Sequence, residues 1–168
     1  MMVKVGILTV SDRSSSGDRP DVSGPALKKI VENQGWTIDA YTIVPDEISR
    51  IKNILQEWVD IKKLNLILTT GGTGFSTRDV TPEATLQVIT KETPGLSEAI
   101  RFEGMKSNLH AILSRGISGI SKQTLIVNLP GNPKAAAESF EVIIPVLPHA
   151  FQLLQNNPDS EQGHHTGN

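Results

Sequence analysis

The sequence contains no cysteine among its 168 residues. Disulfides, thiolate metal sites and a cysteine nucleophile are therefore excluded, which agrees with a cytoplasmic location. Aromatic residues make up only 4%, too few for a platform on which nucleic-acid bases would stack. The formal net charge of −2 gives no general attraction to nucleic acid or to acidic membranes. Because we find neither a signal-peptide pattern nor an apolar run near the roughly 20 residues of a membrane helix, we expect a soluble, cytoplasmic chain.

The length and composition fit one folded domain followed by a short tail. Hydrophobic residues make up 38% of the chain and charged residues 20%, which are ordinary values for a globular protein with a substantial core. The end of the chain is polar and contains glycine, proline and a pair of histidines. We therefore predict a folded domain over residues 1–155 and a disordered tail over residues 156–168.

Short apolar segments rich in β-branched residues alternate with helical patterns along the chain. These segments predict buried strands at residues 3–10, 36–44, 64–69 and 124–128. Apolar residues at spacings of three and four predict helices between them, the first opened by Pro25 and the second capped by Asp46. Further helices are expected at 82–89, at 96–106 and after Pro133.

This alternation predicts an α/β fold, a three-layer sandwich with a mostly parallel sheet and helices on both faces. Residues 109–120 show no clear pattern of either kind. Right-handed crossovers place the carboxyl ends of the parallel strands along one edge of the sheet, where such folds bind ligands. The candidate residues in the loops at that edge are Ser11 and Asp12, then Asp46, a glycine-rich loop after Thr69, and the segment 128–134.

The glycine-rich loop carries the strongest functional signal in the sequence. It joins an apolar strand to a predicted helix, and its first small residues are Gly71, Gly72, Thr73 and Gly74. One interpretation is a tight turn that lets the helix pack closely on the sheet. The other is an anion site, where backbone N–H groups and the positive end of a helix meet a phosphate. The spacing matches neither a Walker A motif nor a dinucleotide fingerprint. We favour the anion site, because Arg78 and Asp79 exceed what a turn requires.

Asp46 and Asp79 are the candidate acidic residues of these loops. An aspartate after a strand commonly caps the next helix, and for Asp46 that interpretation is as plausible as a functional one. Asp79 has the stronger case, because Thr81, followed by Pro82, is expected to cap the next helix through its hydroxyl. Either carboxylate is suited to holding a hard cation such as Mg²⁺, or a proton.

The segment after the last buried strand offers a weaker signal. Lys134 falls in the first turn of a predicted helix, where the macrodipole disfavours a cation by about a few tenths of a kcal/mol. An anion held by Gly131 and Asn132 would reverse that effect, but the penalty is small enough for a solvated surface lysine. The spacing of the histidines predicts neither a zinc site nor a catalytic triad.

Taken together, these motifs resemble the molybdopterin-binding family of MogA and MoaB proteins. The resemblance rests on the glycine-rich loop with residues 78–84 and on residues 44–47 and 128–134. Residues 11–13, 94–96 and 113–115 also match the family pattern, so the resemblance extends from about Val5 to Leu154. It is closest to the molybdopterin adenylyltransferases, including the G domains of gephyrin and of its plant counterpart.

The resemblance implies a homotrimeric enzyme of molybdenum cofactor biosynthesis. Its expected reaction is the Mg²⁺-dependent transfer of AMP from ATP to molybdopterin, with release of pyrophosphate and handover of the product to a metal insertase. The family's two functional aspartates fall on Asp46 and Asp79, which we expect to hold Mg²⁺ or to orient the α-phosphate. The expected nucleotide-binding residues are Gly71, Gly72, Thr73, Gly74, Ser11 and Asp12. The expected molybdopterin-binding residues are Ser114, Arg115, Pro130, Gly131, Asn132 and Lys134.

Two alternatives stay open at this point. One is a MoaB-type paralogue, whose activity transfers less directly from the resemblance. The other is a molybdopterin-binding or scaffolding module without catalysis, for which binding without ATP turnover would be the sign. Retention of Asp46, Asp79 and the sequence at 80–84 favours the active enzyme. No nucleic-acid or membrane partner is expected.

Overall fold

The computed structural model describes residues 2–155, and the predicted tail at 156–168 lies outside the described residues. The described chain forms a six-stranded sheet in the order β2-β1-β3-β6-β5-β4. Its strands are β1 (Lys4–Val10), β2 (Thr37–Val44), β3 (Leu66–Thr70), β4 (Lys91–Glu92), β5 (Ser118–Ser121) and β6 (Thr124–Leu129). The predicted mostly parallel sheet is confirmed, because β2, β1, β3 and β6 are parallel neighbours.

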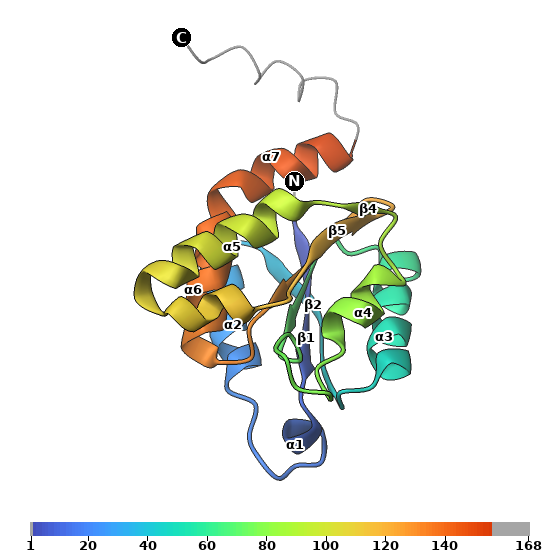
Figure 1. Cartoon of the computed structure of the whole chain (residues 1–168). Helices are drawn as coiled ribbons and strands as arrows, with labels where there is room; N and C mark the ends of the chain where they lie inside the picture. The colour runs from blue at the N-terminus through green and yellow to red at the C-terminus, as the bar shows by residue number, and fades with distance from the viewer. Residues whose placement is uncertain (1, 156–168) are drawn as a thin grey trace.

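Helices cover both faces of the sheet, as predicted (Figure 1). One face packs against α2 (Ser23–Asn33), α5 (Pro94–Ser107), α6 (Pro133–Ile143) and α7 (Leu147–Leu154). The other face packs against α3 (Ile48–Asp60) and α4 (Thr81–Leu86). The alternation of side chains along β1 serves both layers, since Val5 and Ile7 belong to the first core and Leu8 and Val10 to the second. The three-layer α/β sandwich is therefore confirmed.

The carboxyl ends of the parallel strands meet at one edge of the sheet, as the topology requires. The short helix α1 (Asp12–Ser15) follows β1 directly at this edge, at the bottom of Figure 1. The segment between β1 and α2 thus contains one helical turn. Ser11 caps that turn by accepting a hydrogen bond from the backbone N–H of Ser14 at 3.2 Å.

The segment without a clear pattern accounts for most of what sequence reasoning missed. It contains the 3-10 helix η1 (Leu109–Leu113) and most of β5, which runs antiparallel to both β6 and β4. A second 3-10 helix, η2 (Ile144–Val146), joins α6 to α7. The predicted helix at 82–89 is shorter than expected, since α4 ends at Leu86. Strand β5 is short and rich in serine and glycine, so only its neighbours in the sheet define it. A Cβ on Gly119 would lie 2.5 Å from Ile89 Cδ1, which shows how closely this strand packs.

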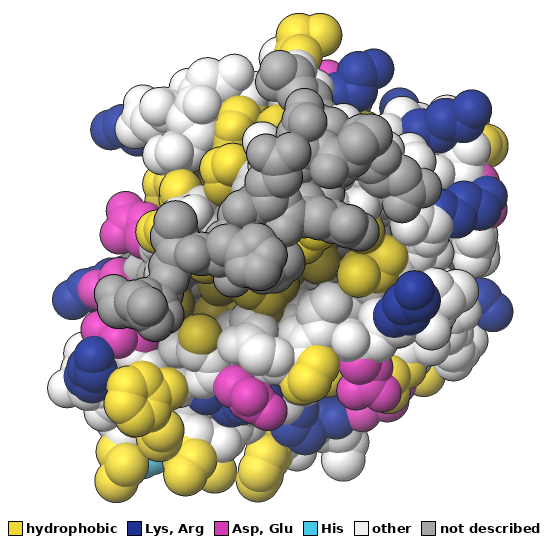
Figure 2. Space-filling view, turned by 90° about the horizontal axis from the view of Figure 1, so that it is seen from above, with side chains coloured by type: hydrophobic (Ala, Val, Ile, Leu, Met, Phe, Trp, Pro, Cys, Tyr) yellow, Lys and Arg dark blue, Asp and Glu magenta, His cyan; other side chains and the backbone are white. Residues whose placement is uncertain are grey.

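Large apolar side chains are exposed on α5 and η1. They are Phe102, Leu109, Ile112 and Leu113. Figure 2 shows hydrophobic side chains gathered at the lower left of the face seen from above, where these two elements lie. Single exposed apolar residues are common on protein surfaces, but several on adjoining elements mark a contact surface. Across residues 2–155, no helix has the length and hydropathy needed to cross a bilayer.

Candidate functional site

A cavity of about 670 Å³ opens at the carboxyl edge of the sheet. The loops after β1, β3 and β6 line it, together with Asp46 after β2. The predicted site residues in its lining are Ser11, Asp12, Asp46, Gly71, Gly72, Asp79, Gly131 and Asn132. Thr73, Gly74, Ser114, Arg115, Pro130 and Lys134 are not in that lining. The structure thus brings Asp46, Asp79 and parts of both predicted binding sets to one cavity.

Asp46 and Asp12 lock the loops after β2 and β1 together. The backbone N–H of Asp12 donates to Asp46 Oδ2 at 2.8 Å, and the backbone N–H of Asp46 donates to Asp12 Oδ1 at 3.0 Å. The prediction that Asp46 caps α3 is wrong, because Glu47 occupies the N-cap position and makes no side-chain cap bond. The helix begins two residues after Asp46, so its carboxylate is free to face the neighbouring loop instead.

The protonation of Asp46 reflects its surroundings. Burial raises the pKa of this carboxyl above its ordinary value, against the hydrogen bond from Asp12. The negative charges of Asp12 and Asp79 raise the pKa further, while Arg78 lowers it. The three acidic side chains therefore repel one another at the cavity. A site with excess negative charge of this kind favours a cation.

Arg78 ties the glycine-rich loop to the loop after β1. Its Nε donates to Asp12 Oδ2 at 3.0 Å and its Nη2 to Asp12 Oδ1 at 2.9 Å. This forked contact lowers the pKa of Asp12, chiefly through the hydrogen bonds from Arg78. Asp12 is thus held as a carboxylate beside Asp46.

Close packing of backbone explains the glycines of this loop. Gly71 has φ +102° and Gly72 has φ +65°, a region that favours glycine. A Cβ on Gly71 would lie 2.2 Å from the carbonyl oxygen of Val10, and one on Gly72 would lie 2.4 Å from Thr81 Oγ1. The tight-turn interpretation therefore accounts for these two glycines without a ligand, and the anion site stays a prediction.

Thr81 closes this turn and does not cap the helix. The N-cap position of α4 belongs to Val80, and Thr81 Oγ1 donates to the carbonyl oxygen of Gly71 at 2.9 Å. The prediction of a Thr81 cap is wrong because this hydroxyl donates to a carbonyl at the start of the glycine-rich loop and accepts no bond from the first turn of α4. Asp79 accepts a hydrogen bond from the backbone N–H of Ser76 at 3.2 Å, so its carboxylate lies over the end of the glycine-rich loop.

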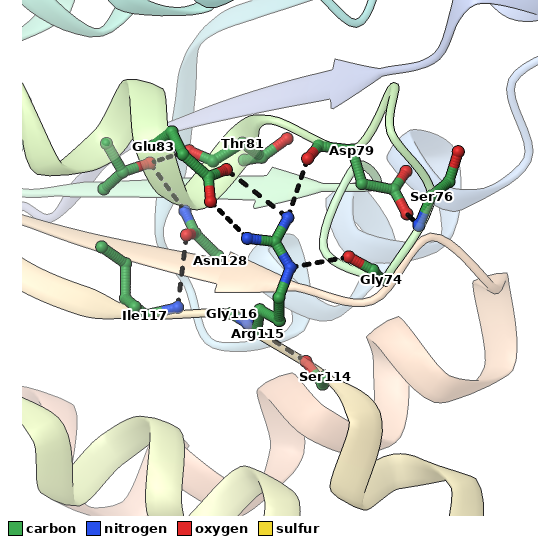
Figure 3. Close-up of polar contacts among 11 residues, drawn as sticks. Gly74, Ser76, Asp79, Thr81, Glu83, Ser114, Arg115, Gly116, Ile117 and Asn128 are labelled. Atoms are coloured by element: carbon green, nitrogen blue, oxygen red, sulfur yellow. Dashed lines mark hydrogen bonds and ion pairs between the residues drawn. The ribbon is translucent and has the colours of Figure 1, made fainter.

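Arg115 holds the same loop from the other side, as Figure 3 shows. Its Nε donates to the carbonyl oxygen of Gly74 and its Nη2 to that of Asp79, each at 2.7 Å. Its backbone N–H donates to the carbonyl oxygen of Thr73 at 2.8 Å. Nη1 pairs with the carboxylate of Glu83. Burial alone would raise the pKa of Glu83, but the hydrogen bond and charge of Arg115, together with a backbone hydrogen bond, leave that pKa lowered.

Glu83 and Asn128 lie in the motifs at 78–84 and 128–134, but the sequence assigned neither of them a role in the site. Asn128 is buried in β6, where its Nδ2 donates to Thr69 Oγ1 at 2.9 Å and to Thr85 Oγ1 at 3.0 Å. Its Oδ1 accepts from the backbone N–H of Ile117 at 3.3 Å. These contacts join β3, α4 and the approach to β5 beneath the glycine-rich loop. The sequence signal for Asn128 was a polar residue directly after the apolar run at 125–127.

Of the predicted residues after β6, Gly131 and Asn132 line the cavity, whereas Pro130 and Lys134 do not. Gly131 approaches Gly71 so closely that an added Cβ would lie 3.2 Å from the Gly71 Cα. Asn132 caps α6 by accepting from the backbone N–H of Ala135 at 3.1 Å. Lys134 is largely exposed and pairs with Glu138 at 3.7 Å, which supports the interpretation of a solvated surface lysine.

The acidic residues suit a cation that shares its coordination with a substrate. Within residues 2–155, no group of three or more His, Cys, Asp or Glu side chains is placed to hold a metal ion. Mg²⁺ usually binds one or two carboxylates together with substrate phosphates and water. Asp46 and Asp79 at one cavity fit that pattern. A second opening of about 620 Å³ lies on the other side of Asp46 and is also lined by Arg78.

Comparisons with known proteins agree with this geometry. The family model described as "Probable molybdopterin binding domain" matches residues 6–149. The molybdenum cofactor synthesis protein cinnamon of Drosophila melanogaster is 47% identical over 153 residues, which cover 90% of this chain but 26% of that longer protein. The molybdopterin adenylyltransferase of Escherichia coli K12 is 42% identical over 173 residues, covering 91% of this chain and 86% of the relative. A solved structure of the molybdopterin biosynthesis enzyme MoaB from Thermus thermophilus has a TM-score of 0.88 and 47% identity, covering 94% and 99% of the two chains.

Proposed function

Because this chain belongs to the molybdopterin-binding domain family, we propose that it is a molybdopterin adenylyltransferase of molybdenum cofactor biosynthesis. A phosphate oxygen of molybdopterin attacks the α-phosphorus of ATP. The bond from that phosphorus to the bridging oxygen breaks, and its electron pair leaves with pyrophosphate. The observation that carries the proposal is the meeting of Asp46, Asp79 and two glycine-containing loops at one cavity.

The chemistry matches what these residues offer. The attacking phosphate is already anionic near neutral pH, so the reaction needs no strong general base. The obstacle is to bring two polyanions together and hold them in line. Asp46 and Asp79 are the residues that would hold Mg²⁺, and the ion would supply charge neutralisation for the phosphates when bound. Arg78 and the reciprocal Asp12–Asp46 hydrogen bonds keep this acidic cluster in place.

The two binding sets keep the roles that we assigned to them. Gly71, Gly72, Thr73, Gly74, Ser11 and Asp12 bind the nucleotide, supported by the position of four of them in the cavity lining. Gly131 and Asn132 contact molybdopterin in the same cavity, while Pro130, Ser114 and Lys134 stay candidates from outside its lining. Arg115 contributes as a positioning residue, because its guanidinium is committed to the carbonyls of Gly74 and Asp79 and to Glu83.

The assembly and location are also part of the proposal. The protein works as a cytoplasmic homotrimer and hands its product to a metal insertase. The exposed apolar side chains on α5 and η1 support self-association. Sedimentation of the purified protein tests this point, since a monomer at micromolar concentration would rule out the trimer.

The test is an assay with molybdopterin, ATP and Mg²⁺ that detects adenylylated molybdopterin. Asp79→Asn should lower turnover by about two orders of magnitude or more, with the melting temperature little changed. Asp18→Asn is the matched control, because Asp18 is exposed on the loop between β1 and α2 and does not line the cavity. Near-normal turnover in Asp79→Asn would contradict the mechanism.

A second candidate is a MoaB-type paralogue, and the likeness to the Thermus thermophilus MoaB structure supports it. The same assay decides whether adenylyl transfer carries over to this chain. Tight binding of molybdopterin with no adenylylated product would instead assign the chain to the binding modules without catalysis.

A further inference from the structure

Two arginines of the loop between β1 and α2 also line the cavity. Arg13 lies in α1 and Arg19 follows it in the loop, and both are exposed. The backbone N–H of Arg19 donates to the carbonyl oxygen of Arg13 at 3.2 Å, so the two side chains start from neighbouring points of the backbone. Neither residue has a role in the reaction as described so far.

The other cations around the glycine-rich loop and α6 are neutralised within the protein. Arg78 pairs with Asp12, Arg115 with Glu83 and Lys134 with Glu138. In the part of the chain that the structure describes, neither Arg13 nor Arg19 has an ion pair or a side-chain hydrogen bond. An exposed arginine is ordinarily just solvated. Here two arginines without an ion pair line the same cavity. Two such positive charges suit a ligand that bears several negative charges.

The loop that carries them is fixed at both ends. The backbone N–H of Ser11 donates to the carbonyl oxygen of Val44 at 2.9 Å, and Ser23 Oγ donates to that of Gly131 at 2.7 Å. Between these anchors, Ser16 Oγ donates to Asp18 Oδ2 at 2.7 Å. The backbone is therefore positioned beside the cavity, while the two arginine side chains stay free to close on a ligand.

The acidic cluster tells which part of ATP these arginines would meet. Transfer takes place at the α-phosphorus, which must lie near Asp46 and Asp79. The β- and γ-phosphates then extend away from the carboxylates and need cations of their own. Guanidinium groups bind phosphate oxygens in a forked, charge-assisted contact. We propose that Arg13 and Arg19 bind the β- and γ-phosphates of ATP and hold the pyrophosphate after the bond to the α-phosphorus breaks. This inference rests on the proposed adenylyl transfer.

Binding measurements with three probes test the inference. ATP, AMP and pyrophosphate are titrated by calorimetry with Mg²⁺ present into the wild type, Arg13→Gln, Arg19→Gln and the double variant. The affinity for ATP and for pyrophosphate should fall about tenfold for each arginine removed, and that for AMP should stay unchanged. Arg50→Gln is the matched control, because Arg50 is exposed on α3 and lines neither opening.

Two results would overturn the inference. One is wild-type affinity for ATP and pyrophosphate in the double variant. The other is an equal loss of AMP affinity, which would place the arginines at the α-phosphate or indicate a damaged fold. The adenylylation assay on the wild type is run separately. If the wild type makes no adenylylated molybdopterin, the proposed function is wrong. If the wild type makes product and the double variant binds ATP and pyrophosphate as tightly as the wild type, only this inference is wrong.

Discussion

Asp12 and Asp46 each accept a hydrogen bond from the other's backbone N–H, at 3.0 and 2.8 Å. Two carboxylates that would repel in isolation are thereby held in neighbouring loops at the carboxyl ends of β1 and β2. Their pKa values move in opposite directions, because Arg78 lowers that of Asp12 while burial raises that of Asp46. Asp12 and Asp46 thus concentrate negative charge at the place where a cation and phosphates are proposed to bind.

Asp46→Asn should make the protein inactive and more stable at neutral pH. A carboxyl whose pKa is raised on folding binds more protons in the folded state, so its contribution to stability falls as pH rises through the folded-state pKa. The asparagine amide does not ionise, so the variant avoids this loss of stability at neutral pH. We expect a gain of at most a few degrees in melting temperature at pH 7, because the half-buried group is partly screened by solvent.

The gain should vanish at about pH 3, below the ordinary aspartate pKa. Melting curves at both pH values measure it. Asp39→Asn, on the exposed part of β2, is the control and should show no such gain. A lower melting temperature of Asp46→Asn at pH 7 would mean that its hydrogen bonds outweigh the charge effect.

Arg78→Lys should impair activity more than stability. Lysine keeps the charge but cannot make the forked contact with both oxygens of Asp12. The pair is exposed and screened by solvent, so the free energy of unfolding measured with denaturant should change little. Turnover should fall about tenfold as the glycine-rich loop loses its tie to the β1 loop, and the pKa of Asp12, followed by NMR, should rise. Unchanged turnover would show that the tie is dispensable.

Gly72→Ala should destabilise the protein more than Gly35→Ala. Both glycines have positive φ, at +65° and +72°, so each alanine meets the same backbone strain of about 1 kcal/mol. A Cβ at Gly35 would have nothing within 4 Å, whereas one at Gly72 would clash with Thr81 Oγ1 at 2.4 Å. Denaturant unfolding of the two variants isolates the cost of the clash, which we expect to add about 1–3 kcal/mol. Equal destabilisation would show that the loop relaxes freely.

Arg115→Met should loosen the glycine-rich loop. The change leaves the carbonyls of Gly74 and Asp79 and the carboxylate of Glu83 without their donor, and we expect a loss of about 1–3 kcal/mol. Adding Glu83→Gln should restore part of this stability, since the lone carboxylate then disappears. Lys106→Met is the comparison, because its pair with Glu103 is exposed and should change stability by less than about 0.5 kcal/mol. Full additivity of Arg115→Met and Glu83→Gln would argue against the coupling.

The sequence predicted the parallel strands because each is a short segment rich in apolar and β-branched residues between helical patterns. Strands β4 and β5 escaped prediction because Lys91–Glu92 and Ser118–Ser121 have no apolar period. They are defined by their pairing, β5 with β6 and β4 with β5. At the site, loop position after each strand sufficed to find Asp12, Asp46 and Asp79. The partners of these residues could not be found in that way. The caps assigned to Asp46 and Thr81 were wrong because both side chains bond to segments distant in sequence, as do Arg115 and Glu83.

The contact of Gly131 with Gly71 joins the loops after β6 and β3 in a seam that leaves little room for a larger residue. A Cβ at Gly131 would lie 3.2 Å from the Gly71 Cα, and one at Gly71 would lie 2.2 Å from the carbonyl oxygen of Val10. Libraries that vary these positions should therefore yield few folded variants. Substitutions at the rim, such as those at Arg13 and Arg19, should combine additively with changes in this seam. Redesign of ligand preference in this protein is thus best directed at the rim, with the glycine seam kept constant.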